Sequence, residues 1–443
     1  MTVKTRFAPS PTGFLHIGNV RTALVNYLFT RKNGGEFLLR MDDTDLQRSK
    51  EEYVNQIKED LTWLGIKWDS YERQSSRSER YNEVKTKLLS MKRLYPCFET
   101  QEELEIKRKM QLSRGQPPIY DRSALKLTAD QIKALEAEGK KPHYRFKMND
   151  SDITWNDMVK GELKFAGNNI SDPIVIREDN SMTYILCSVV DDIDFNITHI
   201  LRGEDHVSNT AVQIQMFEAL QSKHPQFGHT ALIKSKEQEI SKRLGGFDIK
   251  TLREKGIEPM AIASMFAKIG TSDAIEPFLT MDDLTASFDI SKFGKAPANY
   301  DENELFELNR KLVGIMPYAQ AESRLNNLGV KCSTFWDGVK GNLDKVDDIK
   351  YWWDMCVNPI TPVLENNELL STAIKLAPEG NWNLDTWGAW TKAISNESGL
   401  KGKALFMPLR KALTGLEHGP EIKYLLPVIG REKALKRLNG ETA

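Results

Sequence analysis

The sequence is short of cysteine and of net charge, and the shortage of cysteine excludes two kinds of site. Only 4 cysteines occur in 443 residues, far apart from one another, so neither a disulfide framework nor a four-ligand zinc site is indicated. The formal net charge is −1, which argues neither for nor against a nucleic-acid partner, because the local distribution of charge decides that question. The cysteines are Cys97, Cys187, Cys332 and Cys356.

Long hydrophobic runs are missing as well. No apolar stretch approaches the roughly 18 residues that a membrane-spanning helix needs, and the first residues are charged and soon interrupted by Pro9 and Pro11. We therefore expect a cytoplasmic protein with no membrane partner. Hydrophobic residues make up 40% and charged residues 28% of the chain, a composition typical of globular domains, and its length predicts two or three of them.

What the sequence does contain is an alternation of strand and helix patterns. A strand pattern covers residues 3–7, a helical pattern follows Gly13, and a continuous apolar strand covers residues 37–41. Ser49 and Glu52 form a capping-box pattern at the start of a second helix. This order predicts a parallel α/β sheet.

The same alternation returns later in the chain. Strand patterns cover residues 174–177, 197–201 and 229–233, and a helical pattern runs from Ser208 to Leu220. The stretch between the two α/β parts, about residues 71–170, is rich in Lys, Glu and turn signals and looks like an insertion. After about Asn309 only helical patterns remain, which predicts a domain boundary.

The opening stretch RFAPSPTGFLHIGN, residues 6–19, places prolines, glycines and a histidine directly before a helix. A strand, a tight turn and a helix start form an anion site, because free N–H groups and the helix dipole face the ligand. His16 can donate to a phosphate oxygen, and Gly18 lets a nucleotide approach the backbone. The alternative is a histidine that caps a helix beside a structural turn, and this short motif alone favours the alternative.

A second motif, KEQEISKRLGG at residues 236–246, follows the last predicted strand. Its cations Lys242 and Arg243 between polar residues and two glycines are typical of a basic loop that closes over a triphosphate. Taken alone, an exposed charged loop explains it better. Taken together and in this order, the two motifs favour a nucleotide-dependent enzyme.

These motifs also carry a family resemblance. HIGN at residues 16–19 and EISKR at residues 239–243 resemble the two signatures of class I aminoacyl-tRNA synthetases. The stretches RFAPSPTG, LLRMDDTD, ILRGEDHVSNT and LTGLEHGPEI resemble the bacterial glutamyl-tRNA synthetases in particular. The likeness covers nearly the whole chain, and long motifs in the right order are specific.

The resemblance implies a multidomain α/β plus α protein. Its Rossmann-type, parallel-sheet catalytic domain would consist of residues 1–70 and 171–235, around an inserted acceptor-stem-binding domain at residues 71–170. Residues 236–310 would contact the tRNA stem and carry the ISKR loop. Residues 311–443 would form a helical anticodon-binding domain.

The implied activity is that of a glutamate–tRNA ligase. ATP would activate L-glutamate to glutamyl-adenylate, and the glutamyl group would pass to the 3′-terminal adenosine of tRNA(Glu), or also of tRNA(Gln). Mg²⁺ would accompany ATP, bound mainly through the phosphates, and the family is usually monomeric. Some relatives hold zinc in a cysteine cluster of the inserted domain, but Cys97 stands without partners in YPCFET, so we predict no zinc and no other protein-held metal.

Glutamate has two carboxylates and an ammonium, so a specific pocket needs cations and at least one anion. Arg6 and Arg202 match family positions that hold the carboxylates, and Asp42 matches the ammonium position, where the family usually has Glu. A structural ion pair at a strand end is the alternative for either arginine. The other matched glutamate positions are Ala8, Ser10, Tyr184 and Ser188.

The ATP and catalytic positions follow from the same resemblance. Asp205 would meet the ribose hydroxyls, with helix capping before Ser208 as an equal alternative, and Ile233 would meet adenine through its backbone. Together the expected ATP-binding residues are His16, Gly18, Asp205, Ile233, Ser241 and Lys242. The expected catalytic residues are His16, Gly18, Lys242 and Arg243.

The distal part of the chain is rich in tryptophan and in basic residues. Six of the nine tryptophans fall between Trp336 and Trp390, and we expect them to form the core of a helical domain rather than to stack on anticodon bases. From Lys401 to the end there are nine Lys or Arg against four Glu. A solvated helix face explains this excess about as well as a phosphate-binding surface does.

Three other functions remain open at this point. A truncated relative that glutamylates a modified tRNA base would resemble only the catalytic half, whereas this chain continues for about 130 residues. A non-catalytic tRNA-binding relative would not need His16, Gly18 and Lys242. A nucleotidyltransferase that acts on a small molecule would leave the basic C-terminal helices unexplained.

Overall fold

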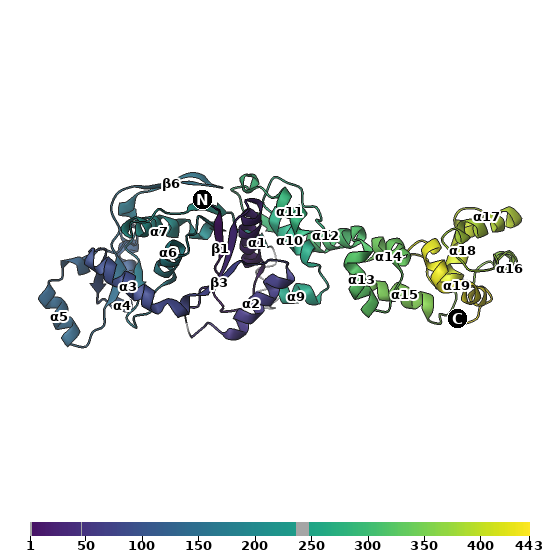
Figure 1. Cartoon of the computed structure of the whole chain (residues 1–443), viewed down its shortest axis with the longest axis horizontal. Helices are drawn as coiled ribbons and strands as arrows, with labels where there is room; N and C mark the ends of the chain where they lie inside the picture. Colours follow the sequence, from purple (N-terminus) through teal and green to yellow (C-terminus); the bar gives the residue numbers. More distant parts are fainter. Residues whose placement is uncertain (1, 46, 236–247) are drawn as a thin grey trace. The chain divides into compact units, whose positions relative to one another are not determined.

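The structure is a computed structural model that describes residues 2–45, 47–235 and 248–443 (Figure 1). The chain divides into two compact units. The first takes in residues 1–252, 262–275 and 280–301, and the second residues 253–261, 276–279 and 302–443. Within the described ranges, no helix combines the length and the apolar character that crossing a membrane requires.

The first unit is built on a parallel sheet, as the alternation predicts. β1 (Lys4–Phe7), β2 (Glu36–Met41) and β3 (Ser70–Arg73) pair in this order, all parallel. α1 (Ile17–Lys32) connects β1 to β2, and α2 (Glu51–Trp63) connects β2 to β3. Five of the six residues of β2 are buried, and these five are apolar apart from Arg40, as expected of a strand inside a parallel sheet.

The second half of the sheet comes from residues beyond the insertion. β9 (His199–Gly203) and β10 (Gln226–Thr230) are parallel and are connected by α7 (Val207–Ala219). The backbone N–H of Thr198, just before β9, donates to the carbonyl of Lys4 in β1 at 2.9 Å. β9 therefore lies beside β1, although almost 200 residues separate them, and α6 (Tyr184–Asp194) precedes it.

Two strand predictions need correction. The strand predicted at residues 229–233 is two strands: β10 ends at Thr230, and β11 (Ile233–Ser235) pairs instead with β12 (Ala298–Tyr300). The strand predicted at 174–177 exists as β8 (Ile174–Ile176), but it pairs antiparallel with β5. An apolar run indicates a buried strand without indicating which sheet buries it.

The capping box predicted at Ser49 is wrong. α2 begins at Glu51, and Lys50 is its N-terminal flanking residue, without a side-chain cap. The Ser49 hydroxyl is buried and has no hydrogen-bond partner among the residues that the structure describes. Its backbone N–H donates to the carbonyl of Asp45 at 2.9 Å, so the chain is still turning at the position where the pattern placed the cap.

The inserted stretch forms a small antiparallel sheet, a hairpin and three helices. β5 (His143–Phe146) lies between β4 (Leu94–Cys97) and β8, and β6 (Ile153–Asp157) pairs with β7 (Gly161–Phe165). Thr100 and Thr128 cap two of its helices by real capping boxes. The helices are α3 (Ser78–Ser90), α4 (Gln101–Ser113) and α5 (Ala129–Ala137).

Helices dominate the rest of the chain. Those before residue 302 are α9 (Ile249–Glu254), α10 (Pro259–Lys268) and α11 (Met281–Ser287). Those after it are α12 (Glu302–Ile315), α13 (Tyr318–Asn327), α14 (Ser333–Val339), α15 (Ile349–Val357), α16 (Asn367–Lys375), α17 (Thr386–Ser398), α18 (Lys403–Thr414) and α19 (Ile422–Leu438). The predicted boundary at 310/311 lies inside α12.

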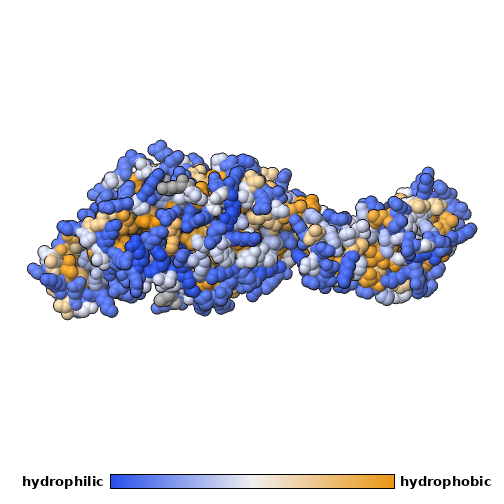
Figure 2. Space-filling model, in the orientation of Figure 1, coloured by the Kyte–Doolittle hydropathy of each residue, from blue (hydrophilic) through white to orange (hydrophobic). Residues whose placement is uncertain are grey.

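The tryptophans of the second unit lie in its core, as predicted. Trp336, Trp382 and Trp390 are buried, and their indole N–H groups donate to backbone carbonyls at 3.0 Å. Trp352, Trp353 and Trp387 pack against the same core while partly exposed. The face of the molecule in Figure 2 is mostly hydrophilic with scattered hydrophobic patches, as expected when such large apolar side chains are inside.

Candidate active site

The histidine of the opening motif caps α1. His16 has an extended backbone, and its Nδ1 accepts a hydrogen bond from the backbone N–H of Gly18 at 3.1 Å. A Cβ at Gly18 would lie 3.0 Å from the His16 ring, so the close approach favours glycine. Burial lowers the pKa of His16, and in the neutral ring Nε2 then carries the proton. The capping role and an Nε2–H donor to an anion at the helix N-terminus are therefore compatible.

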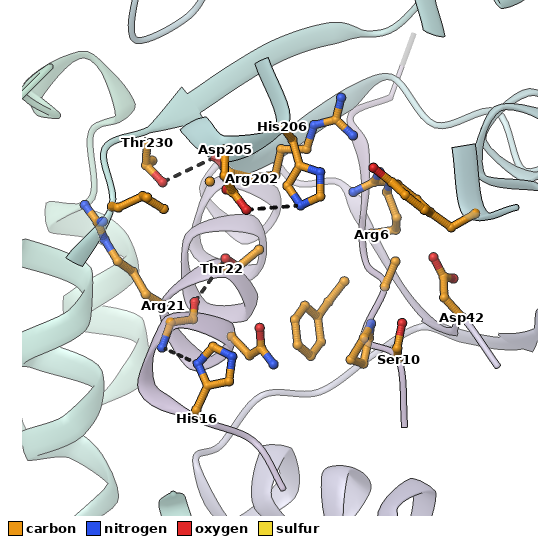
Figure 3. Close-up of a pocket in the computed structure, with 18 of the residues that line it drawn as sticks. Arg6, Ser10, His16, Arg21, Thr22, Asp42, Arg202, Asp205, His206 and Thr230 are labelled. Atoms are coloured by element: carbon orange, nitrogen blue, oxygen red, sulfur yellow. Dashed lines mark hydrogen bonds and ion pairs between the residues drawn. The ribbon is translucent and has the colours of Figure 1, made fainter. Parts of the chain in front are cut away.

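A cavity of about 540 Å³ opens beside this helix start (Figure 3). Figure 3 shows Arg6, Ser10 and Asp42 on one side of it and Arg21 and Thr230 on the other. Every described residue that the sequence singled out for the site lines this cavity: Arg6, Ala8, Ser10, His16, Gly18, Asp42, Tyr184, Ser188, Arg202, Asp205 and Ile233. The structure thus gathers into one place residues that span 228 positions of the sequence.

The wall on the Arg6 side is a network of buried charges. Arg6 donates from Nε to Asp192 at 3.1 Å, and Arg40 donates from Nη1 to the same carboxylate oxygen at 3.0 Å. Arg40 also pairs with Asp42 and lies 3.6 Å from Asp191. The ion pair that was the alternative interpretation of Arg6 therefore exists, and Arg6 lines the cavity at the same time.

Arg202 is different, because it is a buried cation without a carboxylate partner in the described part of the chain. It is 8% exposed, and its Nη2 donates to Thr210 Oγ1 at 2.6 Å and to Gln213 Oε1 at 2.7 Å. Burial, reinforced by the nearby positive charge of Arg6, lowers the pKa of Arg202 to about 10. A buried positive charge that faces a cavity is stabilised by an anionic ligand, so Arg202 is suited to receive a substrate carboxylate.

Asp42 supplies the negative charge of the cavity. Its two carboxylate oxygens accept from Arg40 Nε at 2.7 Å and from Arg40 Nη2 at 3.1 Å. Burial raises the pKa of Asp42 to about 6, although Arg40 opposes the shift. The backbone N–H of Asp42 donates to the carbonyl of Pro9 at 3.0 Å, which fixes the shorter acidic side chain beside the opening turn. Ser188 accepts from Arg40 Nη2 at 3.2 Å and so helps to orient the same guanidinium.

The remaining matched residues contribute to the other walls. The phenol oxygen of Tyr184 accepts a short hydrogen bond from Asn209, and its ring meets His206 edge to face at 6.2 Å. Asp205 does not cap α7, because His206 is the flanking residue and makes no side-chain cap. Ile233 begins β11, so its backbone is held in a strand at the cavity wall.

Several lining residues were not anticipated from the sequence. They are Arg21, Thr22, Arg40, His206 and Thr230. Arg40 had a readable signal, since it is the one charged residue among the five buried residues of β2. Arg21 had none: it donates to the carbonyls of Ala231 at 2.6 Å and Ile269 at 3.1 Å, contacts that only the fold creates.

The basic loop lies outside the described residues. Ser241, Lys242 and Arg243 fall in the stretch 236–247, so their predicted parts in ATP binding and catalysis stay predictions. The described chain resumes at Asp248, whose neighbour Ile249 donates its backbone N–H to the carbonyl of Leu15 at 3.2 Å. The segment after the loop therefore returns to the opening turn.

The expectation that no other possible metal ligand lies beside Cys97 is wrong, because the fold brings two such side chains close to it. Ligand atoms of Cys97, Glu99 and His143 lie within 4.8 Å of one another. One Glu99 oxygen accepts from Tyr120 at 2.6 Å and from Ser123 at 2.9 Å. Burial raises the pKa of Cys97 to about 12, so the thiol is protonated in the metal-free protein. The absence of zinc stays a prediction.

Comparison with known proteins covers almost the whole chain. Residues 2–307 match the family model "tRNA synthetases class I (E and Q), catalytic domain", and residues 362–440 match "Anticodon binding domain". Glutamate–tRNA ligase 2 of Rickettsia canadensis and glutamate–tRNA ligase 1 of Rickettsia massiliae are each 54% identical over 98% of this chain and 99% of their own. A crystal structure of a glutamate tRNA ligase from Elizabethkingia meningosepticum with its amino acid matches with a TM-score of 0.85, at 27% identity, over 99% of both chains.

Proposed function

Because the chain belongs to the class I tRNA synthetases for glutamate and glutamine, we propose that it is a glutamate–tRNA ligase whose reaction takes place in the cavity of Figure 3. The enzyme uses ATP, L-glutamate and tRNA. One observation carries the assignment to this cavity: Arg202, buried and without a carboxylate partner among the described residues, faces the same space as an Asp42 carboxylate. This arrangement is complementary to an amino acid with an additional carboxylate.

Glutamate would bind between the charged walls. Arg202 keeps Nη1 free of partners in the described ranges and presents it to one substrate carboxylate, with Arg6 nearby to support the other. Asp42 accepts from the ammonium while Arg40 holds the carboxylate in place. Glutamine would leave a buried cation facing a neutral amide, which disfavours it.

ATP would bind across the start of α1. The His16 Nε2–H donates to a phosphate oxygen, Gly18 allows close approach, and the helix dipole favours the negative charge. Adenine would meet the backbone at Ile233, and the ribose hydroxyls would meet Asp205. Ser241, Lys242 and Arg243 would supply the remaining contacts and cations from the basic loop, and Mg²⁺ would accompany the phosphates, with no zinc involved.

The chemistry has two balanced steps. A glutamate α-carboxylate oxygen attacks the α-phosphorus, the bond to the pyrophosphate oxygen breaks, and pyrophosphate leaves with the electron pair. Lys242 and the His16 N–H stabilise the charge that grows on the phosphates. A ribose hydroxyl of the 3′-terminal adenosine, the 2′-hydroxyl in this class, then attacks the carbonyl carbon, loses its proton and displaces AMP.

The partner assignment follows from the same membership. Residues 71–170 would bind the acceptor stem, 236–310 would contact the stem, and 311–443 would read the anticodon, within which residues 362–440 match the anticodon-binding model. The substrate would be tRNA(Glu), or tRNA(Gln) as well, charged by a monomer in the cytoplasm. The match beyond the catalytic half disfavours a truncated tRNA-base modifier, and full-length relatives named as ligases disfavour a binding-only role.

ATP–pyrophosphate exchange with L-glutamate and tRNA present tests the activity. We expect exchange, followed by charging of tRNA(Glu), and separate charging of purified tRNA(Gln) decides its range. Lys242→Ala should lower turnover by about 100- to 1,000-fold, as loss of one transition-state donor does. Wild-type protein without exchange would contradict the function, and full turnover in the variant would contradict the part given to Lys242.

A further inference from the structure

The hairpin of the inserted stretch ends in a fully buried carboxylate. Asp157, the last residue of β6, is 3% exposed, and one of its oxygens accepts from the backbone N–H groups of Val159 and Lys160 at 3.0 Å. The same oxygen accepts from the backbone N–H of His229 at 3.1 Å, and the other lies 2.5 Å from His229 Nδ1. The turn of the hairpin is therefore tied to β10 of the parallel sheet.

This contact decides where the proton of His229 sits. Although burial opposes it, hydrogen bonding from His229 and from backbone N–H groups lowers the pKa of Asp157 to about 2, so the carboxylate can only accept. Burial lowers the pKa of His229, which favours the neutral ring, and beside a carboxylate that only accepts, Nδ1 of this ring donates and Nε2 holds a lone pair. Nε2 lies 2.9 Å from the hydroxyl oxygen of Thr210.

Thr210 connects His229 to Arg202, which lines the cavity. The threonine oxygen accepts from Arg202 Nη2 at 2.6 Å, and the same hydroxyl lies 2.9 Å from His229 Nε2 and 3.2 Å from the carbonyl oxygen of His206. Arg202 Nε lies 3.4 Å from His229 Nε2 as well. Asp157 and His229 do not line the cavity, yet hydrogen-bonding contacts connect the hairpin to Arg202 through His229 and Thr210.

The same turn reaches a second part of the cavity lining through Lys160. Its ammonium makes a short ion pair with Glu204 and donates to the carbonyl of Lys295 at 3.2 Å. The second oxygen of Glu204 accepts from the backbone N–H of Leu232 at 3.2 Å. Leu232 lines the cavity next to Ile233. Lys160 holds Glu204, and Glu204 holds the Leu232 backbone, so Lys160 indirectly fixes the backbone that we propose to contact adenine.

We propose that Asp157 and Lys160 are positioning residues for two parts of the cavity lining. Asp157 sets Arg202 for glutamate through His229 and Thr210, and Lys160 sets the Leu232 backbone for ATP through Glu204. The proposal rests on the proposed function for what each part binds. Since the turn spans only four residues, one small element of the inserted stretch controls both substrates.

Paired kinetics on three variants test this proposal. Asp157→Asn should raise KM for glutamate about tenfold, because a charge-assisted contact is lost, and leave KM for ATP within about twofold. Lys160→Met should do the reverse. Asp152→Asn is the matched control: it lies at the same hairpin, is half exposed, and pairs with Lys164 at 2.7 Å on the surface, so both KM values should stay at the wild-type level.

A purely structural role predicts a different pattern. It would lower the thermal midpoint and move both KM values together in each variant, and that result would overturn the proposal, as would unchanged KM values. Loss of exchange in the wild-type protein would instead remove the proposed function. The two failures are therefore distinguishable.

A measurement on the wild-type protein covers the case in which Asp157→Asn does not fold. The chain has 7 histidines, few enough for ¹⁵N-imidazole NMR, with His229→Gln identifying the signal. We expect the neutral His229 ring to carry its proton on Nδ1 at pH 8, above the lowered pKa of this group. A proton on Nε2 of the neutral ring would overturn the Asp157 half of the proposal whether or not the enzyme is active.

Discussion

Two fully buried arginines, one in each unit, show two different uses of the same side chain. Arg40 in the first unit is surrounded by the carboxylates of Asp42, Asp191 and Asp192, which raise its pKa in spite of burial. Arg437 in the second unit is equally buried, but burial lowers its pKa. Within the described residues it donates to main-chain oxygens, those of Leu413 at 2.7 Å, Met355 at 3.0 Å and Ala443 at 2.7 Å among them.

The difference teaches that a buried charge does not by itself mark a functional site. Arg437 satisfies carbonyls at the ends of α15 and α18, where no intrahelical donor is available, and it lies in a packed core. Arg40 holds acidic groups at the wall of a cavity and leaves some of their acceptor capacity facing it. The identity of the partners, rather than burial, separates the catalytic unit from the helical unit.

The largest effect is expected from Arg40→Met. It leaves three buried carboxylates near one another without their shared cation, and breaking a buried ion pair costs about 3–5 kcal/mol. We expect the free energy of unfolding of the first unit to fall by about that amount and glutamate activation to be lost. Urea unfolding and pyrophosphate exchange measure the two. A stable variant that still activates glutamate would contradict the role of Arg40.

Arg437→Met should come second and affect only stability. Several buried carbonyls lose their donor, each at a cost of about 1 kcal/mol or more, so we expect a loss of about 3 kcal/mol in the second unit. KM for glutamate should be unchanged in the folded protein. A shift in this KM without a fall in the thermal midpoint would break the comparison between the two arginines.

Arg202→Gln sharpens the comparison. In the described residues, Arg202 donates to the neutral side chains of Thr210 and Gln213, rather than to the carboxylates that hold Arg40 or the backbone carbonyls that hold Arg437. Losing a charge-assisted contact to the substrate should lower kcat/KM for glutamate about 30-fold, while glutamine is affected less. The preference for glutamate over glutamine therefore falls. The ratio of the two kcat/KM values is the measurement, and an unchanged ratio would make Arg202 a structural residue.

The smallest effect concerns pH. Because the pKa of Asp42 is raised to about 6, the carboxylate loses its charge as the pH falls through 6. KM for glutamate should then rise about fourfold from pH 7.5 to pH 5.5. The sign for stability is the opposite: the contribution of this group is full below about pH 3.9 and is lost as the pH rises through 6. A flat KM profile, or one unchanged in Asp42→Asn, would contradict the proposed contact with the ammonium.

Much of the fold could be predicted from the sequence, and the two wrong strand predictions share a cause. The parallel sheet and the helix that begins at His16 follow from periodicity and turn chemistry. Two features do not follow from these signals: which sheet contains β8, and the break at Ala231 and Leu232 between two strands. Both depend on pairing partners that lie far away in the sequence. Ser49 failed for a local reason: its capping pattern competes with a turn that its own backbone makes with Asp45.

The residues of the candidate site could be predicted where they belong to a sequence motif. All matched residues in the described ranges reached one cavity. Residues that act through long-range contacts left no pattern: Arg21 binds carbonyls more than 200 positions away, and Asp157 meets a histidine 72 positions later. Sequence spacing carries no information about such contacts.

The charged wall of the cavity joins residues that the ribosome makes far apart in time. Arg6 is separated from Asp192 by 186 positions and Arg40 by 152, and β1 gains its neighbour β9 over a similar interval. At ribosomal rates of 5–20 residues per second, Arg6 waits roughly 10–40 seconds for Asp192, whereas Arg40 has Asp42 two positions away. During that time the nascent chain has one open strand edge at β1, which is the kind of surface that favours aggregation. Residue 192 must leave the ribosome before this part of the enzyme can form.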